Sequence, residues 1–116
     1  MIEKIVLDYL TPRLSVPVLP EVPERPPERF VIVEKTGGGI EEGLHTATLI
    51  VQSCAPQLLD ALQLNEKAKA AMLELDALPD VCRVSLNNDY RFTDPTLKRR
   101  RYQAVFDIVY YGEYGN

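Results

Sequence analysis

The segment from Arg101 to Tyr111 constrains the fold more than any other part of the sequence. Successive side chains of a strand point to opposite sides of a sheet, and a strand buried on one side alternates cleanly between apolar and polar residues. Here one alternating set has apolar bodies throughout: Tyr102, Ala104, Phe106, Ile108 and Tyr110. The other set is half apolar: Gln103, Val105, Asp107, Val109 and Tyr111. Such a strand needs cover on both sides, from core packing alone or from a helix on one face and a neighbouring subunit at the rim.

The size and composition of the chain are those of one ordinary globular domain. Its 116 residues predict a single domain over 1–116, and 46% apolar residues suffice to order a core. The formal net charge of -4 disfavours attraction of the whole protein to nucleic acid or to an anionic membrane, which are themselves negative. No run approaches the roughly 20 apolar residues of a membrane span, and the first residues do not lead into a signal-peptide core. We expect a cytoplasmic protein.

The N-terminal quarter of the chain combines a short helix with a proline-rich arm. Apolar residues recur at three- and four-residue spacing over 2–10, and Thr11-Pro12 ends this amphipathic helix. Six of the nine prolines lie within 12–27, interleaved with Leu14, Val16, Val18, Leu19 and Val22. Because proline removes backbone donors and favours extended geometry, this segment predicts an ordered extended arm or sheet edge. At the other end of the chain, 112–116 should fray.

A β-hairpin should follow the arm. The β-branched run 30–35 predicts a strand that closes at Thr36-Gly37-Gly38-Gly39. A second strand is predicted over 45–52, where Ala47, Leu49 and Val51 share one face. We expect the two strands to pair across a flexible, glycine-rich loop over 37–43.

The C-terminal half adds one long helix and two more strands. Apolar and small residues recur at helical period over 54–75, with Ser53 as the N-cap. A third strand over 81–92 and a last strand over 98–111 are joined by a predicted turn at 93–96. The order helix, arm, strand, strand, helix, strand, strand predicts an α+β fold with a four-stranded, largely antiparallel sheet packed by two helices.

The sequence offers no recognisable catalytic or metal-binding constellation. Acid–base and nucleophilic chemistry need a poised group with an orienting partner, and the single histidine, His45, stands at the start of a predicted strand, where we expect an exposed side chain. Cys54 and Cys82 form no ligand pattern with it, and we expect both to be free, buried thiols. The glycines at 37–39 are not followed by the Gly-Lys-Ser/Thr of a phosphate-binding loop. We therefore expect no enzyme, no cofactor and no metal.

Lys98-Arg99-Arg100-Arg101 is the strongest charge cluster, and Tyr90, Phe92 and Tyr102 lie near it in the sequence. Basic residues beside aromatic rings are typical of single-stranded nucleic-acid sites, where bases stack on the rings. Alternatively, the arginines face solvent and pair with acidic groups of this chain or of another subunit. The net negative charge favours the second interpretation, so Arg99 and Arg101 are candidates for contacts between subunits.

Several phrases of the sequence resemble small proteins encoded in the head–tail connector region of long-tailed bacteriophages and prophages. They are 27–38 (PERFVIVEKTGG), 47–53 (ATLIVQS), 64–67 (LNEK), 86–94 (LNNDYRFTD) and 101–108 (RYQAVFDI). With the first helix, they cover nearly the whole chain, and they are structural phrases rather than a catalytic signature. Within this group of proteins the chain resembles the tail terminator family.

The resemblance implies a structural role without catalysis. In that family, subunits with a helix-flanked sheet close into a ring, usually a hexamer, which caps the tail tube, ends its polymerisation and presents a surface for the head connector. The implied partners are further copies of the chain, the tail tube protein and a head-connector protein. The implied locations are the host bacterial cytoplasm during assembly and the virion tail afterwards. Contacts are expected from the arm, the glycine-rich loop and the basic run, at Val18, Val22, Gly37, Gly38, Gly39, Glu41, Glu42, Arg99 and Arg101.

Two alternatives stay open. A head–tail adaptor or head-closure ring subunit belongs to the same group of virion proteins, and the sequence pattern does not separate it from a terminator. A small nucleic-acid-binding module that uses Lys98 to Arg101 belongs to a different class. The number of subunits cannot be read from the sequence, because ring closure depends on the angle between two surface patches.

Overall fold

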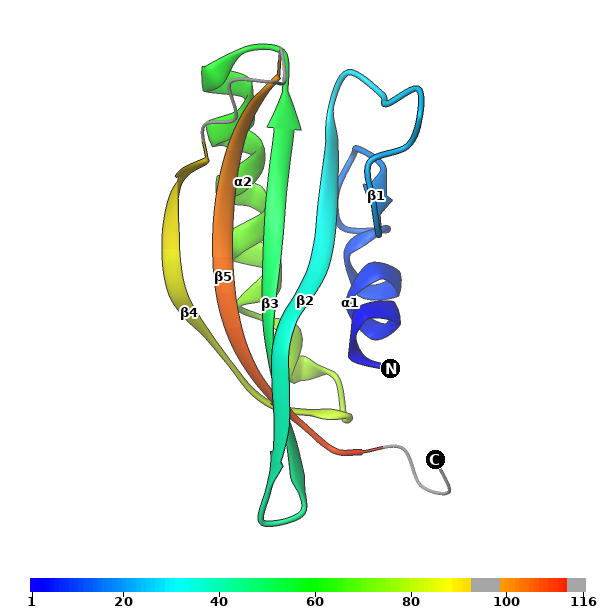
Figure 1. Ribbon diagram of the computed structural model, residues 1–116, viewed down its shortest axis with the longest axis vertical. Helices are drawn as coiled ribbons and strands as arrows, with labels where there is room; N and C mark the ends of the chain where they lie inside the picture. The colour runs from blue at the N-terminus through cyan, green and yellow to red at the C-terminus, as the bar shows by residue number, and fades with distance from the viewer. Residues whose placement is uncertain (93–98, 113–116) are drawn as a thin grey trace.

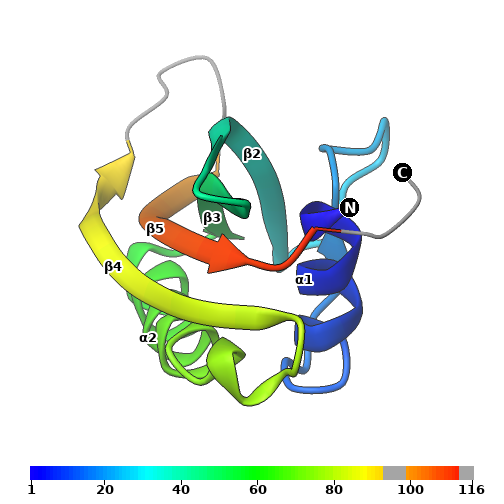
Figure 2. The same cartoon turned by 90° about the horizontal axis from the view of Figure 1, so that it is seen from below.

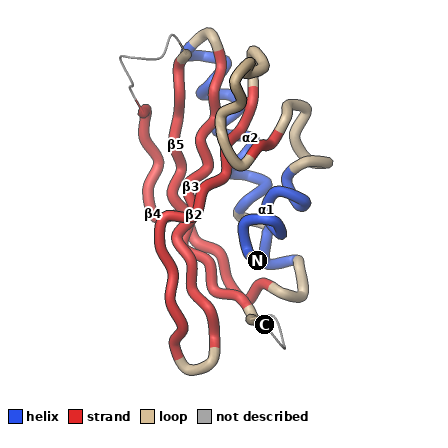
Figure 3. Tube along the Cα trace, turned by 45° about the vertical axis from the view of Figure 1, so that its right-hand side comes forward, coloured by secondary structure: helices blue, strands red, loops and turns tan. Residues whose placement is uncertain are grey.

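The computed structural model describes residues 1–92 and 99–112, which form a curved sheet with both helices on one of its faces (Figures 1 and 3). In chain order the elements are α1 (Ile2–Leu10), β1 (Val18–Leu19), β2 (Phe30–Glu41), β3 (Leu44–Ala55), α2 (Leu58–Met72), the 3-10 turn η1 (Leu75–Ala77), β4 (Val81–Phe92) and β5 (Arg100–Tyr110). The strands lie side by side in the order β1-β2-β3-β5-β4. The α+β class and the two helices agree with the sequence prediction, but the sheet has five strands where the sequence predicts four.

Helix α1 forms where the amphipathic spacing predicts it. Its buried residues recur with helical period along one side, and they are Ile2, Val6, Tyr9 and Leu10. The Tyr9 hydroxyl donates a 2.7 Å hydrogen bond to the Ala71 carbonyl oxygen of α2, which ties the two helices together. Burial raises the pKa of Tyr9, against the opposing effect of the Arg13 charge. The hydroxyl therefore stays protonated and keeps donating at neutral pH.

The proline-rich arm contributes the fifth strand, and this strand runs parallel to its neighbour. The two residues of β1 pair with Val31 and Ile32 of β2, so the sheet is mixed rather than wholly antiparallel. Strand β1 is short because it lies between Pro17 and Pro20, and proline lacks the N–H group that a longer ladder needs. The expected arm over 12–27 is therefore attached to the sheet by one brief stretch.

The hairpin of β2 and β3 is longer and tighter than its sequence suggests. The two strands pair as predicted, but the predicted loop over 37–43 is wrong, because its three glycines belong to β2. The turn consists of Glu42 and Gly43 alone, with φ angles of 51° and 82°. Two positive φ angles are typical of a type I′ turn, whose twist matches that of the flanking strands. Glycine suits the strand because a Cβ on Gly38 would lie 2.9 Å from the Thr46 carbonyl oxygen.

Helix α2 is shorter than predicted at both ends. It spans Leu58–Met72 rather than 54–75, and 53–55 complete strand β3 instead of starting the helix. Strand pairing is preferred here because it buries Cys54 fully against Phe30. Small and apolar side chains still form the predicted buried stripe of the helix: Ala61, Leu64, Ala68 and Met72.

Strands β4 and β5 lie where the sequence predicts them. β4 coincides with the predicted 81–92, and β5 falls within the predicted 98–111. Three parts of the sequence predictions lie outside the described residues, namely Lys98, the turn at 93–96 and positions 113–116 of the frayed end.

Strand β4 forms one edge of the sheet, and its pairing with β5 is interrupted twice. The register shifts between Val81 and Arg83 and again between Leu86 and Asn88. Bulges of this kind bend an edge strand and make it a poor template for another strand. The long edge is therefore protected against uncontrolled sheet extension.

The two faces of the sheet differ in their cover (Figure 2). The main core lies under the helices, where Leu49, Leu75 and Phe106 are fully buried, so the predicted helix cover on one face of β5 is confirmed. No helix of the described residues packs on the other face, which we call the open face. A small apolar cluster lies on its β2 side and contains Phe30, Ile32 and Cys54 with Leu19 of β1. Cover of the open face by a neighbouring subunit stays a prediction.

Candidate assembly interface

The hairpin of β2 and β3 extends beyond the part of the sheet that the helices cover (Figure 1). All residues from 34 to 43 are exposed, although strand pairing continues to the turn. We call Ile40, Glu41, Glu42 and Gly43 the acidic tip. Ile40 is 70% exposed, and neither glutamate forms an ion pair with a described residue. An ordered hairpin that ends in two negative charges and an exposed apolar side chain is suited to contact another molecule.

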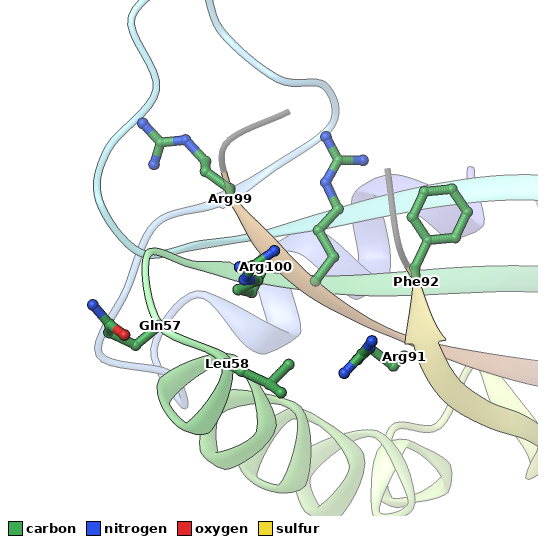
Figure 4. Close-up of a pocket in the computed structure, with 7 residues that line it drawn as sticks. Gln57, Leu58, Arg91, Phe92, Arg99 and Arg100 are labelled. Atoms are coloured by element: carbon green, nitrogen blue, oxygen red, sulfur yellow. The ribbon is translucent and has the colours of Figure 1, made fainter. Parts of the chain in front are cut away.

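A hollow lined by arginines (Figure 4) lies at the opposite end of the sheet, where β4 ends and β5 and α2 begin (Figure 1). We call it the arginine hollow; it has a volume of ≈ 330 Å³ and is lined by Gln57, Leu58, Arg91, Phe92, Arg99, Arg100 and Arg101. Its residues come from the end of β4, the beginning of β5 and the N-terminal end of α2. The fold thus brings four guanidinium groups together, although Arg91 belongs to a different strand from the run at 99–101.

Two of the four arginines are held by hydrogen bonds within the chain. Arg99 donates to the carbonyl oxygens of Pro27 and Glu28 at 2.7 and 3.3 Å. Arg101 is 9% exposed and donates to Gln52 Oε1 at 3.4 Å. Within 1–92 and 99–112, none of the four arginines forms an ion pair with a carboxylate. The hollow is therefore a concentration of positive charge that the described part of the chain leaves uncompensated.

A row of polar side chains crosses the open face, and we call it the polar ladder. Gln52 Nε2 donates to Gln103 Oε1 at 2.7 Å, and Gln103 Nε2 donates to the Tyr90 hydroxyl. Both glutamines are nearly buried, at 8% and 7% exposure. With Arg101 at one end, the ladder satisfies amide groups whose burial would otherwise cost free energy. The open face is thus closed to water near its middle without a covering helix.

Asp107 organises a second polar group on the open face. Its carboxylate accepts a 3.3 Å hydrogen bond from Thr48 Oγ1 and a 2.8 Å bond from Asn87 Nδ2. Since these bonds join β3, β4 and β5, they add side-chain links to the backbone ladder. The result is a group of amide, hydroxyl and carboxylate side chains on this face, with Arg83 beside it.

On the helix-covered side, Asp89 joins β4 to α2. It accepts hydrogen bonds from Asn65 at 2.8 Å and from Lys69 at 2.5 Å, and Lys69 also contacts Glu66. Burial acts to raise the pKa of Asp89, but the hydrogen bonds from Lys69 and Asn65 outweigh it and hold the pKa below its ordinary value. The carboxylate stays charged near neutral pH, so this cluster serves to position β4.

The nine predicted contact residues lie in three places. The hairpin brings five of them together on exposed backbone: Gly37, Gly38, Gly39, Glu41 and Glu42. In the arm, Val22 is 45% exposed, whereas Val18 is half-buried against the core. Arg99 and Arg101 lie in the arginine hollow, and both are partly occupied by internal bonds. Contact of these residues with other proteins stays a prediction.

Sequence reasoning missed three residues of these surfaces: Gln52, Arg91 and Gln103. Arg91 stands apart from the basic run, and no local pattern shows that β4 and β5 place it beside that run. The glutamines did leave a signal, because each interrupts an apolar stretch that the sequence assigns to a buried strand. Buried polar groups require partners, so two such interruptions predict a pair across neighbouring strands.

The residues considered for chemistry are placed as follows. His45 is half-buried rather than exposed, with its ring centroid 5.3 Å from that of Tyr110. Both thiols are free as predicted, but Cys54 is buried while Cys82 is exposed. Among the described residues, no three His, Cys, Asp or Glu side chains are grouped so that they could hold a metal ion. No helix in the described ranges is long and apolar enough to cross a membrane.

No protein-family model matches the chain, and no curated protein matches it. A chain in the structure "Virion of native gene transfer agent (GTA) particle" is similar with a TM-score of 0.47 and 14% identity, over 82% of this chain and 78% of that one. A crystal structure from Akkermansia muciniphila is similar with a TM-score of 0.42 and 14% identity, over 75% of this chain and 44% of that one. Both TM-scores lie below 0.5, so neither similarity assigns a family or a function to this chain.

Proposed function

We propose that this chain is a structural subunit of a phage or prophage tail. Copies would form a ring that caps the tail tube, ends its polymerisation and presents a surface for attachment of the head. The observation that carries the proposal is the ordered surface that one copy leaves unused: a projecting hairpin, an open sheet face and an uncompensated arginine hollow. A ring built head to tail requires two different contact patches on each copy. The sequence resemblance to the tail terminator family is the reason for proposing a ring on the tail tube rather than another assembly.

The groups considered for catalysis also support a structural role. His45 packs against Tyr110 and forms no ion pair with a carboxylate of residues 1–92 and 99–112. Burial raises the pKa of the Cys54 thiol to about 11, so the thiol is protonated and unreactive near neutral pH. Neither side chain is therefore prepared to act as a base or nucleophile.

Electron microscopy of purified tail tubes mixed with the protein tests this proposal. We expect rings at one end of the tubes and tubes that stop growing when the protein is added. A shortened variant, in which 40–45 is replaced by Asn-Gly, keeps the pairing of Gly39 with Thr46 and a two-residue turn. It should fold and lose capping. The matched control is Glu3→Gln in the first turn of α1, which should cap as the wild type does.

The same experiment separates the proposal from its alternatives. Binding to capsids or portals, with tube ends left bare, would favour a head–tail adaptor or head-closure ring over a terminator. A protein that binds neither particle would contradict the proposed role. The nucleic-acid alternative is favoured by one observation, the gathering of Arg91 with the run at 99–101 beside Phe92. Salt-dependent retention on single-stranded DNA would support it.

A further inference from the structure

We infer that the acidic tip of one copy docks in the arginine hollow of the next copy, so that the partner of the hollow is a second copy of this chain. The inference rests on the proposed ring-forming function and names the contact that would join its subunits. The described chain measures 43 Å along its longest axis, and the tip and the hollow lie at opposite ends of that axis (Figure 1). A copy cannot fill its own hollow, whereas a neighbouring copy can.

The charges of the two ends are complementary. Glu41 and Glu42 have no cationic partner among the described residues, and the four arginines of the hollow have no anionic one. A guanidinium group presents several N–H donors in a planar fork that fits the two oxygens of a carboxylate. Inside a recess that partly excludes water, such a pair attracts more strongly than on an open surface. Two glutamates at the end of a narrow hairpin suit a hollow of ≈ 330 Å³.

Two further observations indicate that the hollow lacks an anionic occupant. Arg101 lines it and is 9% exposed, yet its Nε–H is buried and has no hydrogen-bond partner in the described chain. Helix α2 begins at the hollow, and its N-cap residue Gln57 makes no side-chain capping bond to the first-turn N–H groups. The N-terminal end of a helix carries partial positive charge and unpaired donors. Buried donors of this kind are normally satisfied, and incoming carboxylate oxygens would satisfy them.

An apolar contact accompanies the charges. Ile40 is 70% exposed beside the two glutamates of the tip, and Leu58 and Phe92 line the hollow. An exposed isoleucine that becomes buried at a contact strengthens that contact through the hydrophobic effect. The tip and the hollow therefore match in apolar surface as well as in charge.

The surroundings of the hollow favour a carboxylate over a nucleic-acid backbone. A strand of nucleic acid is followed by a basic groove that spans several nucleotides. Here the arginines are confined to one end of the molecule, and the adjoining open face carries the polar ladder and the Asp107 carboxylate. A phosphate chain that left the hollow along this face would meet the neutral ladder and then the Asp107 carboxylate before it reached Arg83, which lies beside Asp107.

Reciprocal charge reversal tests the inference, with sedimentation velocity as the readout. The tip variant is Glu41→Arg with Glu42→Arg, and the hollow variant is Arg91→Glu with Arg100→Glu. The side chains of Arg91 and Arg100 are exposed and make no hydrogen bond or ion pair within the described ranges, so both variants should fold. Glu74→Arg with Asp76→Arg is the matched control, because it makes the same change of charge at exposed positions outside the tip, the hollow and the arm.

The wild type and the control should associate beyond the monomer, and more weakly as salt rises from ~50 to ~500 mM. Each reversed variant alone should associate about 100-fold more weakly or worse. An equal mixture of the two variants should associate again, because each reversed tip then meets a reversed hollow. Rescue by mixing cannot arise from misfolding, since each variant would have to be folded to restore the other.

Three results would overturn the inference: a wild type that stays monomeric throughout, reversed variants that associate like the wild type, or a mixture that is not rescued. Loss of single-stranded DNA retention in the hollow variant, with association unchanged, would also overturn it and assign the hollow to nucleic acid. Tube capping shows whether the docking contact or the proposed function has failed. Reversed variants that associate and cap normally would leave the proposed function standing, whereas a rescued mixture that caps no tube would leave only the docking contact.

Discussion

The two faces of strand β5 are shielded from water in different ways. Towards the helices, Ala104, Phe106 and Ile108 are buried at 1% exposure or less and pack in the main core. Towards the open face, the buried Gln103 is hydrogen-bonded to a neighbouring glutamine, and the half-buried Asp107 is hydrogen-bonded to β3 and β4. One face is closed by hydrophobic packing beneath helices, and the other is closed by polar groups that satisfy one another.

The difference shows how one sheet can stabilise a chain and still offer a surface. Apolar burial under the helices supplies the large favourable contribution to folding. The polar ladder contributes less, because each of its hydrogen bonds replaces bonds to water. Its advantage is that a partner can cover it or leave it without exposing a core. The open face is therefore compatible both with an isolated copy and with an assembled one.

Truncation of Phe106 should have the largest effect on this comparison. Phe106→Ala removes a fully buried ring from the main core, and we expect the free energy of unfolding to fall by ~3–5 kcal/mol. Val105→Ala, on the open face of the same strand, is the control and should cost about 1 kcal/mol or less. Urea unfolding followed by circular dichroism measures both. Equal losses would show that the open face carries as much packing energy as the core.

Breaking the polar ladder should have an intermediate effect. Gln103→Ala leaves the Gln52 amide nearly buried without its partner, so we expect a loss of about 1–3 kcal/mol in unfolding free energy. The double change of Gln52 and Gln103 to Leu should restore only part of that loss, because no unpaired amide remains but Arg101 loses its bond to Gln52 Oε1. A double-mutant cycle measures the coupling. Strictly additive losses would show that the two amides do not support each other.

The Asp89 cluster should have a smaller effect that depends on pH. Because the pKa of Asp89 is lower in the folded chain than its ordinary value of 3.8, its contribution is fully present above that value. The contribution is lost as the pH falls through the lowered pKa. Asp89→Asn should therefore cost about 1 kcal/mol or less near neutral pH, since the site is partly exposed, and make stability less dependent on pH below ~4.

Asp8→Asn provides the matched control for this prediction. Asp8 pairs with Lys4 on the exposed side of α1, where both side chains are largely open to water. Its replacement should change stability by at most ~0.5 kcal/mol. Unfolding midpoints measured across the acid range separate the two variants. Identical profiles would show that Asp89 does not help to hold β4 against α2.

The two cysteines should differ in reactivity with no change in stability. Cys82 is exposed, whereas burial raises the pKa of Cys54 to about 11. A thiol reagent at neutral pH should therefore modify one site in the native chain and both in denaturant. Mass spectrometry of Cys82→Ser, which should stay unmodified until it unfolds, checks the assignment. Rapid modification of that variant would show that the β2 side of the open face opens readily.

Periodic segments of this fold could be predicted from the sequence. The first helix and the strand over 81–92 match their predicted bounds because residues that break helices mark them, Thr11-Pro12 after the helix and Pro79-Asp80 before the strand. Strand β1 could not be predicted, since two residues between prolines are too few to show a periodic pattern. The glycines at 37–39 suggest a loop by composition, yet cross-strand pairing with β3 keeps them extended. Helix α2 begins late because burial of Cys54 in the sheet outweighs its local helical pattern.

The candidate interface could be predicted only in part. Exposed hairpin residues such as Glu41 and Glu42 are adjacent in the sequence, so the sequence alone predicts that they form one surface. The arginine hollow depends on the antiparallel pairing of Arg91 with Tyr102, which no local pattern contains. Pairing across strands likewise brings Gln52 opposite Gln103. Residues that meet only through topology are therefore the ones that sequence reasoning misses.

The order of the strands has a consequence for how the chain folds. Strand β5 lies between β3 and β4, although both precede it in the sequence. During synthesis β3 and β4 leave the ribosome before the strand that joins them, so each waits with an unpaired edge. The sheet closes only when β5 enters the gap. We therefore expect the pairing of β5 to limit the rate of folding. Chains should be most prone to aggregate before β5 has paired.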